Sequence, residues 1–409
     1  MKKFPSFLSL SIKNYRQYLL GFFVSQMGWQ MQAIAINWQM YEMTHSAVAL
    51  GLIGVVSFAP LLLFSMIGGM TADNVNRKTL MLVTQACLAV FALGLATITA
   101  SGDMTPLLLF VFLALNFAAM AFFGPVRQSI VPDLVPKKYL MNAISLNTLA
   151  RQSAVIIGPA IAGFLIATRG VQSIYIFNTV ALFLTMVTVI SLSIPTHAAE
   201  TRPSFTFASL ADGIRFVKNS NIMLSTILLD FFATFFGSAT SLLPIFAAVI
   251  LQVDAKGLGL LYAATSVGGV VAGLALSACK KLRHQGIIII VSVLIYGCAT
   301  IGFGLSNSLY LTLFLLAVIG AADMVSTILR NTIRQMITPA RMRGRMVGIN
   351  TLFAAGGPKL GDAEAGFLAA ATSAPFSVVI GGIGTIVATL FIAFRLPHLR
   401  KYEGESIVE

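Results

Sequence analysis

The chain has 409 residues, of which 57% are hydrophobic and only 10% are charged. A soluble domain carries about 25% charged residues, so this composition excludes an ordinary soluble enzyme. The net charge of +13 is common in nucleic-acid-binding proteins, but in so apolar a chain it indicates basic loops at one face of a membrane. We therefore expect the lipid bilayer, and no nucleic acid, as a partner. The three cysteines show no disulfide framework and no metal-ligand spacing.

Apolar runs long enough to cross a bilayer, about 20 residues each, recur along the whole chain. They predict twelve membrane-spanning helices, over residues 17–41, 47–72, 79–100, 104–128, 139–168, 171–194, 221–250, 257–280, 286–305, 308–335, 344–371 and 375–396. With both termini in the cytoplasm, 23 of the 27 Lys and Arg residues fall on the cytoplasmic side. Because basic residues concentrate in cytoplasmic loops, this asymmetry predicts that orientation.

The first predicted helix has a polar stripe formed by Gln26, Gln30 and Asn37, with Trp29 beside it. Such a stripe faces a cavity or another helix rather than lipid. We predict that these four residues line a substrate cavity, where Trp29 would form part of an aromatic wall. A role of Trp29 in the core or at the membrane interface stays open.

A short polar turn follows the second predicted helix, in the stretch Gly69-Met70-Thr71-Ala72-Asp73-Asn74-Val75-Asn76-Arg77-Lys78. This stretch resembles the loop between the second and third helices of the major facilitator superfamily, written G-x-L-a-D-r-x-G-r-k. Gly69, Ala72, Asp73, Arg77 and Lys78 match that pattern, and residues 71, 74 and 76 depart from it. The resemblance implies a role in gating for Gly69, Asp73, Arg77 and Lys78. For the two basic residues, a purely topological role stays open.

Two segments repeat between the halves of the chain. Arg127-Gln128-Ser129-Ile130-Val131-Pro132 closes the fourth predicted helix, and Arg334-Gln335-Met336-Ile337-Thr338-Pro339 closes the tenth. Gly158-Pro159 in the fifth corresponds to Gly357-Pro358 in the eleventh. Repeated six-helix halves place a binding site near the bilayer midplane. Arg127 and Arg334 are counted with the gating residues.

With these repeats, the superfamily resemblance covers nearly the whole chain. It implies an all-α membrane protein with twelve transmembrane helices in two pseudo-symmetric six-helix bundles. The expected domains are an N-terminal bundle over 1–194, a cytoplasmic linker over 195–220, a C-terminal bundle over 221–398 and a cytoplasmic tail over 399–409. The linker contains either an amphipathic surface helix or a solvated segment with a short helical turn.

The fifth predicted helix contains Gly158-Pro159-Ala160-Ile161-Ala162-Gly163. This stretch resembles the antiporter motif G-P-x-x-G-G, with Ala162 in place of a Gly. The resemblance implies efflux by exchange, with Gly158 and Pro159 allowing the helix to bend. Ordinary close packing of small residues is the alternative.

Charged and polar side chains also lie inside the later helices. Asp230 and Thr234 belong to a stripe on the seventh, and Asp323, Thr327, Arg330 and Arg334 to another on the tenth. A charge at a helix centre costs about 2.5–3.5 kcal/mol on insertion scales, so each needs a partner or a use. We predict that Asp323, and after it Asp230, couples transport to protons, although either could simply hold helices together. Arg151, Asn116, Thr234 and Thr327 complete the predicted substrate cavity, and Lys359 and Asp362 are predicted to form a buried ion pair.

Within the superfamily, Val126–Pro136 resembles the branch that contains siderophore exporters and macrolide-efflux proteins. Gly361-Asp362-Ala363-Glu364-Ala365-Gly366 resembles the siderophore exporters in particular. The resemblance implies a proton-driven exporter of a small molecule, first a siderophore, in the bacterial inner membrane. Drugs and macrolides or lysophospholipids are the alternative cargoes, and a non-transporting scaffold or sensor is the alternative of another class.

Enzymatic signatures are not found in the sequence. No phosphate-binding G-x-x-x-x-G-K-[ST] occurs, and no catalytic residue, metal or cofactor is expected. The expected partners are the small-molecule substrate and protons. A periplasmic or outer-membrane efflux protein is left open.

Overall fold

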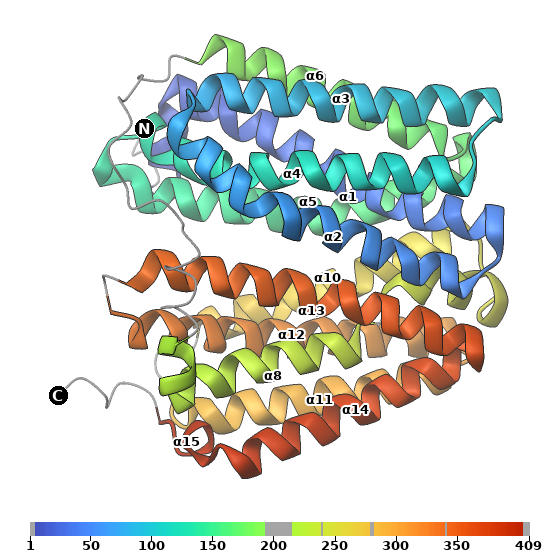
Figure 1. Ribbon diagram of the computed structural model, residues 1–409, viewed down its shortest axis with the longest axis vertical. Coiled ribbons are helices and arrows are strands. Elements are labelled where there is room, and N and C mark those ends of the chain that lie inside the picture. The colour runs from blue at the N-terminus through green and yellow to red at the C-terminus, as the bar shows by residue number, and fades with distance from the viewer. Residues whose placement is uncertain (1–4, 193–214, 239, 279–281, 340–341, 404–409) are drawn as a thin grey trace. The chain divides into compact units, whose positions relative to one another are not determined.

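A computed structural model describes residues 5–192, 215–238, 240–278, 282–339 and 342–403, and every regular element in them is a helix (Figure 1). The chain divides into two compact units. The first, here the N-unit, comprises residues 1–43 and 59–204, and the second, the C-unit, comprises 44–58 and 205–409. The division between them runs through a helix, so the early part of that helix packs in the C-unit.

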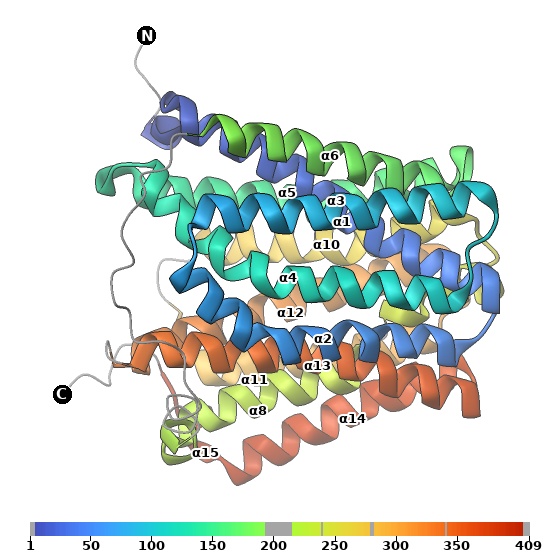
Figure 2. The same cartoon turned by 45° about the horizontal axis from the view of Figure 1, so that its top comes forward.

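The N-unit contains the helices up to residue 191. They are the 3-10 helix η1 (Pro5–Ser11), α1 (Lys13–Thr44), α2 (Ala47–Asn74, shared with the C-unit), α3 (Arg77–Ser101), α4 (Pro106–Leu134), the 3-10 helix η2 (Lys137–Tyr139), α5 (Leu140–Arg169) and α6 (Gln172–Ser191). Helix α3 packs against both α6 and α4 (Figure 2).

The C-unit begins with a segment of several short elements. They are α8 (Asn221–Gly237), the 3-10 helix η3 (Thr240–Leu242), α9 (Leu243–Ile245) and the π-helix η4 (Phe246–Ile250). The remaining helices are α10 (Ala255–Ala278), α11 (Gln285–Leu305), α12 (Leu309–Ile337), α13 (Arg343–Ala371), α14 (Ala374–Arg395) and α15 (Pro397–Arg400).

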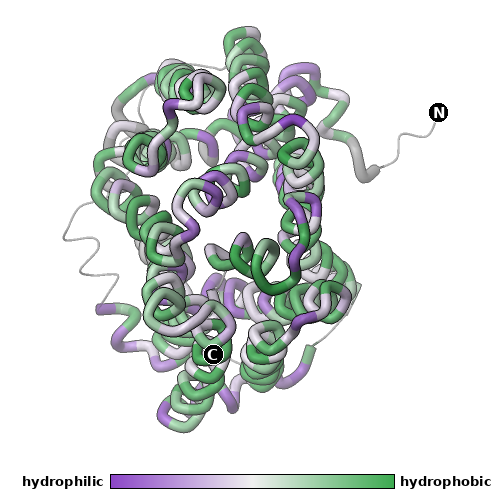
Figure 3. The backbone as a smooth tube through the Cα atoms, turned by 90° about the vertical axis from the view of Figure 1, so that its right-hand side faces the viewer, coloured by the Kyte–Doolittle hydropathy of each residue, from purple (hydrophilic) through white to green (hydrophobic). Residues whose placement is uncertain are grey.

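The long helices confirm the predicted fold class. Within the described residues, ten segments are long and apolar enough to cross a membrane, and apolar residues predominate along them (Figure 3). Helices α1 and α13 have the necessary length, at 32 and 29 residues, but more polar residues interrupt them. Together these agree with the twelve predicted spans. In ten of them both ends lie within about four residues of the predicted ones, and α4 continues to Leu134 beyond its predicted end at residue 128.

The prediction of one continuous helix over 221–250 is wrong. Helix α8 ends at Gly237, and Ser238 has extended backbone angles. Pro244, in the first turn of α9, has no N–H to continue a helical hydrogen-bond ladder. A break exposes backbone groups, which must be satisfied inside the protein when no water is near. In this segment the carboxylate of Asp362 does so, by accepting from the Ser241 N–H at 3.2 Å.

Local sequence explains several helix ends. Thr105 caps α4 through its hydroxyl, which accepts from the Leu108 N–H at 3.3 Å, and Pro106 follows in the first turn, where the missing N–H is not needed. Gly102 ends α3 with φ of 83°, a left-handed conformation that suits glycine. Asn76, one of the departures from the superfamily pattern, caps α3 by accepting from the N–H groups of Lys78 and Thr79.

Glycines allow two helices of the C-unit to cross closely. A Cβ on Gly268 of α10 would collide with the carbonyl of Ala317, and one on Gly320 of α12 would collide with the carbonyl of Thr265. The reciprocal pair brings the two backbones into contact, as small residues do in membrane helices.

The predicted linker lies mostly outside the described residues. Its last part, residues 215–219, is helical, and Val217 is buried in a cluster with Met223, Ile227, Met342 and Met346. This segment is therefore anchored to the C-unit by apolar contacts.

Candidate functional site

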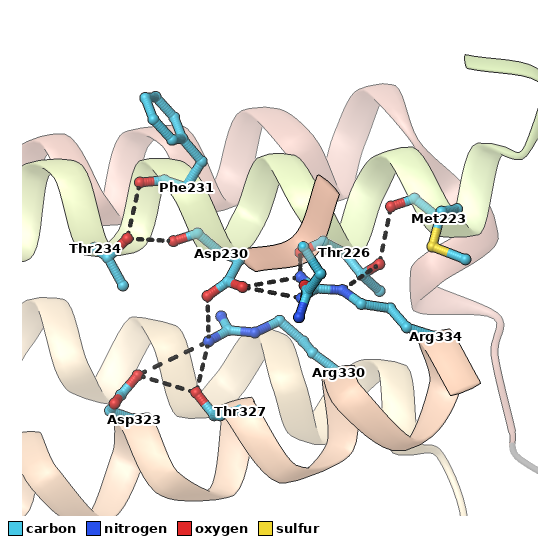
Figure 4. Close-up of polar contacts among 10 residues, drawn as sticks. Met223, Thr226, Asp230, Phe231, Thr234, Asp323, Thr327, Arg330 and Arg334 are labelled. Atoms are coloured by element: carbon cyan, nitrogen blue, oxygen red, sulfur yellow. Dashed lines mark hydrogen bonds and ion pairs between the residues drawn. The ribbon is translucent and has the colours of Figure 1, made fainter. Parts of the chain in front are cut away.

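A cluster of four charged side chains joins α8 to α12 in the C-unit (Figure 4). Asp230 of α8 is bound by two arginines of α12: Arg330 Nη2 lies 2.9 Å from one carboxylate oxygen, and Arg334 Nη1 and Nη2 each lie 3.0 Å from the other. All three side chains are largely buried, with 13%, 1% and 7% exposure. Because breaking such a pair leaves an uncompensated buried charge, this cluster fixes α8 against α12.

Arg334 is also tied to α8 and α13 by uncharged groups. Its Nε donates to the Thr226 hydroxyl at 3.3 Å, its Nη2 to the Thr226 carbonyl at 2.5 Å, and its Nη1 to the side chain of Asn350. With so many acceptors, the guanidinium has one fixed position near the end of α12. The predicted stripe on this helix is therefore real, and its last member joins three helices.

Asp323 occupies a different environment. Its carboxylate lies 3.8 Å from Arg330 Nη2 and accepts from the Thr327 hydroxyl at 3.4 Å. The side chain is 49% exposed, against 13% for Asp230. Spacings of four and three residues put Asp323, Thr327 and Arg330 on one face of α12. The two predicted coupling carboxylates thus meet at one arginine, but only Asp323 has about half of its side-chain surface exposed.

Asp323 faces a cavity of about 210 Å³ inside the C-unit. The lining also includes Thr234, Ser238 and Tyr296, together with apolar side chains such as Phe303 and Leu316. Tyr296 donates to the Gly237 carbonyl at 2.9 Å, at the end of α8. The cavity therefore lies at the broken helix and offers one carboxylate in mainly apolar surroundings, an arrangement suited to a small polar ligand or to a proton.

Arg330 has hydrogen-bonding capacity left over. Within the described residues its Nε and Nη1 have no acceptor, although the side chain is 1% exposed. Buried donors are nearly always paired, so these two indicate a place for water or a ligand. The charges of the cluster add to zero when both carboxylates are ionised, and protonation of Asp323 would leave one positive charge in excess.

Polar side chains inside the N-unit form a network in which Asn116 is the one member predicted from the sequence. Asn178 of α6 donates to Gln32 at 2.6 Å, and Gln32 donates to Asn116 of α4 at 3.5 Å. Tyr175 likewise donates to Gln39 at 2.7 Å. These contacts join α1 to α4 and α6 in the interior. Gln32 and Asn178 were not among the predicted residues, although an amide in an apolar run is itself a signal.

Gln26, Trp29 and Asn116 do lie together, around a small cavity of about 20 Å³. Trp29 packs edge-on against Phe117, with ring centroids 5.5 Å apart. Gln30 instead contacts α5 at Gly158, and the amide of Asn37 donates to the Ala33 carbonyl of its own helix. The structure thus brings three of the predicted residues of α1 and α4 together and places the other two elsewhere.

Arg127 and Arg151 line a separate recess of about 350 Å³ in the N-unit. Arg127 Nη1 donates to the side-chain oxygen Oε1 of Gln26 at 3.1 Å, and its guanidinium lies 5.4 Å from the ring centre of Phe22. Arg151 therefore shares a recess with Arg127, which Gln26 and Trp29 do not line.

The basic residues of the predicted gating loop both tie helices together. Arg77 Nη1 lies 2.8 Å from the Asp133 carboxylate, which links the start of α3 to the end of α4. Lys78 Nζ donates to the carbonyls of Ile190 and Leu192 at the end of α6, where free carbonyls attract a cation. The side chain of Asp73 and the surroundings of Gly69 lie outside the described part, so their roles stay predictions.

Helices α5 and α13 each pack against another helix of their own unit through corresponding glycines. A Cβ on Gly158 would lie 3.1 Å from the Cβ of Gln30 in α1. A Cβ on Gly357 would meet the hydroxyl of Thr234 in α8. Pro159 and Pro358 follow inside unbroken helices. The repeat read from the sequence thus has the same packing role in both units.

Asp362 has partners that the sequence did not predict. Its carboxylate accepts from the hydroxyls of Ser238 and Thr240 at 3.1 and 3.0 Å, and from the Ser241 N–H. The side chain is buried, so it acts as a cap for the broken seventh helix. The pairing of Lys359 with Asp362 stays a prediction. Among the described residues, no three His, Cys, Asp or Glu side chains come together as metal ligands.

Comparisons with known proteins match almost the full chain. A family model described as "Transmembrane secretion effector" matches residues 5–408. The enterobactin exporter EntS of Citrobacter koseri is 27% identical over 389 residues, covering 95% of this chain and 93% of that protein. EntS of Shigella boydii serotype 18 is 28% identical over 407 residues, covering 98% and 97%.

A solved structure with the same fold is that of a POT family transporter in complex with 5-aminolevulinic acid. It superposes with a TM-score of 0.75 at 13% identity, covering 95% of this chain and 96% of that one. At that identity the likeness concerns the fold alone.

Proposed function

Since the chain belongs to the transmembrane secretion effector family of the major facilitator superfamily, we propose that it exports a siderophore across the bacterial inner membrane. It is a transporter and not an enzyme. Its relatives named enterobactin exporters support the cargo class, because they match over nearly their full length. Multidrug or macrolide efflux and lysophospholipid transport are the competing cargoes.

We further propose that export is driven by proton antiport, with Asp323 as the proton carrier. The observation that carries this proposal is the contrast between the two carboxylates: Asp230 is held by two arginines, whereas Asp323 is half exposed to a cavity. An ionised Asp323 can accept hydrogen bonds from a cargo, and a protonated one loses that charge. Proton and cargo would then occupy the cavity in turn.

Such a cycle requires the protein to alternate between an inward-open and an outward-open state. The distribution of basic residues supports an orientation with both termini in the cytoplasm. Gly158 would permit the necessary movement of α5 against α1. Gly158→Leu should then slow transport while the protein still reaches the membrane, and a normal rate would exclude this role.

Reconstituted liposomes test the coupling. Asp323→Asn should abolish uphill transport driven by a pH gradient but retain exchange of cargo without a gradient. Asp103→Asn, on the exposed turn after α3, is the matched control and should transport normally. Full uphill transport by Asp323→Asn would exclude this residue as the proton carrier.

The cargo is tested separately, by metabolite profiling of culture medium with and without the gene, at high and low iron. A siderophore that disappears from the medium only in the deletion strain supports the proposal. If no metabolite changes and liposomes show no flux, the protein is a scaffold or sensor instead.

A further inference from the structure

The N-unit has an open recess of about 350 Å³, built from α1, α4 and α5. These three helices run next to one another in the first half of the chain (Figure 1). The volume is within the range of small-molecule sites. The C-unit cavity that contains Asp323 is lined by residues of other helices.

The recess is positively charged. Arg127 and Arg151 both line it, and among the described residues no carboxylate lines it or pairs with either arginine. The nearest acid along α4, Asp133, is already engaged by Arg77 at 2.8 Å. Two like charges that line one recess repel each other, and an anion placed between them would relieve the repulsion.

Aromatic side chains form part of the wall. Tyr18 and Phe22 line the recess, and Arg127 lies over the Phe22 ring at 5.4 Å and over the Phe123 ring at 5.9 Å. Arginine stacks on rings while its N–H groups remain directed at an acceptor. The recess therefore offers ring surface and positive charge at the same place.

Two uncharged polar side chains complete the lining, Asn147 and Thr148 of α5. The amide oxygen of Asn147 accepts from the Tyr15 hydroxyl at 3.4 Å, so its N–H groups remain as donors. Together with the two guanidinium groups, this gives a site rich in donors, which suits a ligand made of acceptors.

We propose that this recess binds an anionic aromatic group of the cargo, with Arg127 and Arg151 on the acid group and Tyr18 and Phe22 against the ring. This proposal rests on the proposed export function, because it takes the bound group to be part of the exported molecule. An anionic lipid headgroup would share the charge but not the preference for a ring, and the experiment separates the two.

The test measures binding of 2-hydroxybenzoate to the purified full-length protein by ligand-observed NMR, in nanodiscs of phosphatidylcholine. Arg127→Gln and Arg151→Gln should each weaken binding about tenfold or more, because each removes a charge-assisted hydrogen bond. Arg169→Gln, at the end of the same helix α5 as Arg151 but outside the recess, is the matched control and should bind as the unaltered protein does. Equal binding by all four proteins would overturn the proposal. Because Arg151 is exposed, its variant keeps the test valid even if Arg127→Gln does not fold.

Two further probes separate charge from ring. Cyclohexanecarboxylate has the charge without an aromatic ring, and benzyl alcohol has the ring without the charge. Both should bind at least tenfold more weakly than 2-hydroxybenzoate. If nanodiscs containing phosphatidylglycerol abolish binding of 2-hydroxybenzoate, the recess is a lipid site and the proposal fails.

Binding and export can fail independently. If the protein binds the aromatic anion through both arginines but exports no siderophore, the site proposal stands and the proposed function fails. If it exports a siderophore at the same rate with Arg127→Gln and Arg151→Gln, the proposed function stands and the site proposal fails.

Discussion

The two units use corresponding arginines differently. Arg127, near the end of the fourth helix of the N-unit, donates to the amide Gln26 and lies over two aromatic rings. Arg334, in the same place in the C-unit, binds the carboxylate of Asp230. The first arginine keeps a charge that a ligand can use, whereas the second is neutralised within the protein. A duplicated fold can thus assign ligand recognition to one half and a protected charge cluster to the other.

The largest effect should come from Asp230→Asn. This change leaves two buried arginines, of which only Arg330 has another carboxylate nearby, that of Asp323 at 3.8 Å. Losing one partner of a buried pair costs about 3–5 kcal/mol. We expect a marked fall in the unfolding temperature of the purified protein. The N-unit counterpart Gln26→Leu removes one hydrogen bond from a charged arginine and should cost less, about 1.5–3 kcal/mol.

A further variant sharpens that result. If Asp230→Asn is destabilising because of uncompensated charge, adding Arg330→Gln should restore part of the loss. Unfolding of Asp230→Asn at the temperature of the original protein would contradict the difference between the two units.

The paired glycines should give the next largest effect. Gly357→Ala forces the Thr234 hydroxyl away from its position, where it donates to the Asp230 carbonyl at 2.7 Å. Overpacking of this kind costs about 1–3 kcal/mol. Gly158→Ala meets only the Cβ of Gln30, at 3.1 Å, and should cost less. Equal losses for the two variants, measured by thermal unfolding, would show that α5 and α13 are packed with the same tightness.

The turns that precede α3 and α11 differ in a smaller way. Asn76 caps α3 with its side chain, whereas His284, at the start of α11, makes no side-chain cap and has φ of 57°. Asn76→Ala should therefore destabilise by about 1 kcal/mol. His284→Gly should instead stabilise by about 0.5–1 kcal/mol, since glycine adopts left-handed angles freely. A loss of stability in both variants would contradict this difference.

The smallest effect on stability is expected for Asp323→Asn. Its carboxylate is half exposed and 3.8 Å from Arg330, so its loss should cost less than about 1 kcal/mol. The same unfolding measurement made for Asp230→Asn checks this value. A loss as large as that of Asp230→Asn would mean that both carboxylates are structural.

The sequence was sufficient for what depends on local pattern. Apolar runs located the helices, and spacing along one helix placed Asp323, Thr327, Arg330 and Arg334 on a shared face. The repeat of the Gly-Pro pair, at residues 158–159 and again at 357–358, located equivalent packing sites in the two halves. Each of these follows from the period of the helix or from a repeat within this one chain.

What the sequence could not supply depends on contacts between distant segments. Nothing near Asp362 indicates that it binds Ser238, Thr240 and Ser241, more than a hundred positions earlier. The pairing of Asp230 with both arginines likewise could not be predicted, because it depends on how α8 packs against α12. The break after Gly237 had one local sign, Pro244, but the apolar run around it favoured a continuous helix.

The cap on the broken seventh helix has a consequence for biosynthesis. Asp362 lies 121 to 124 residues after the groups that it holds. At 5–20 residues per second, a ribosome needs about 6–25 s to make that stretch. For that time the backbone of the break lacks its cap, although unsatisfied polar groups in hydrocarbon cost several kcal/mol. The spanning segment that begins with α8 therefore reaches its final form only after α13 has been inserted.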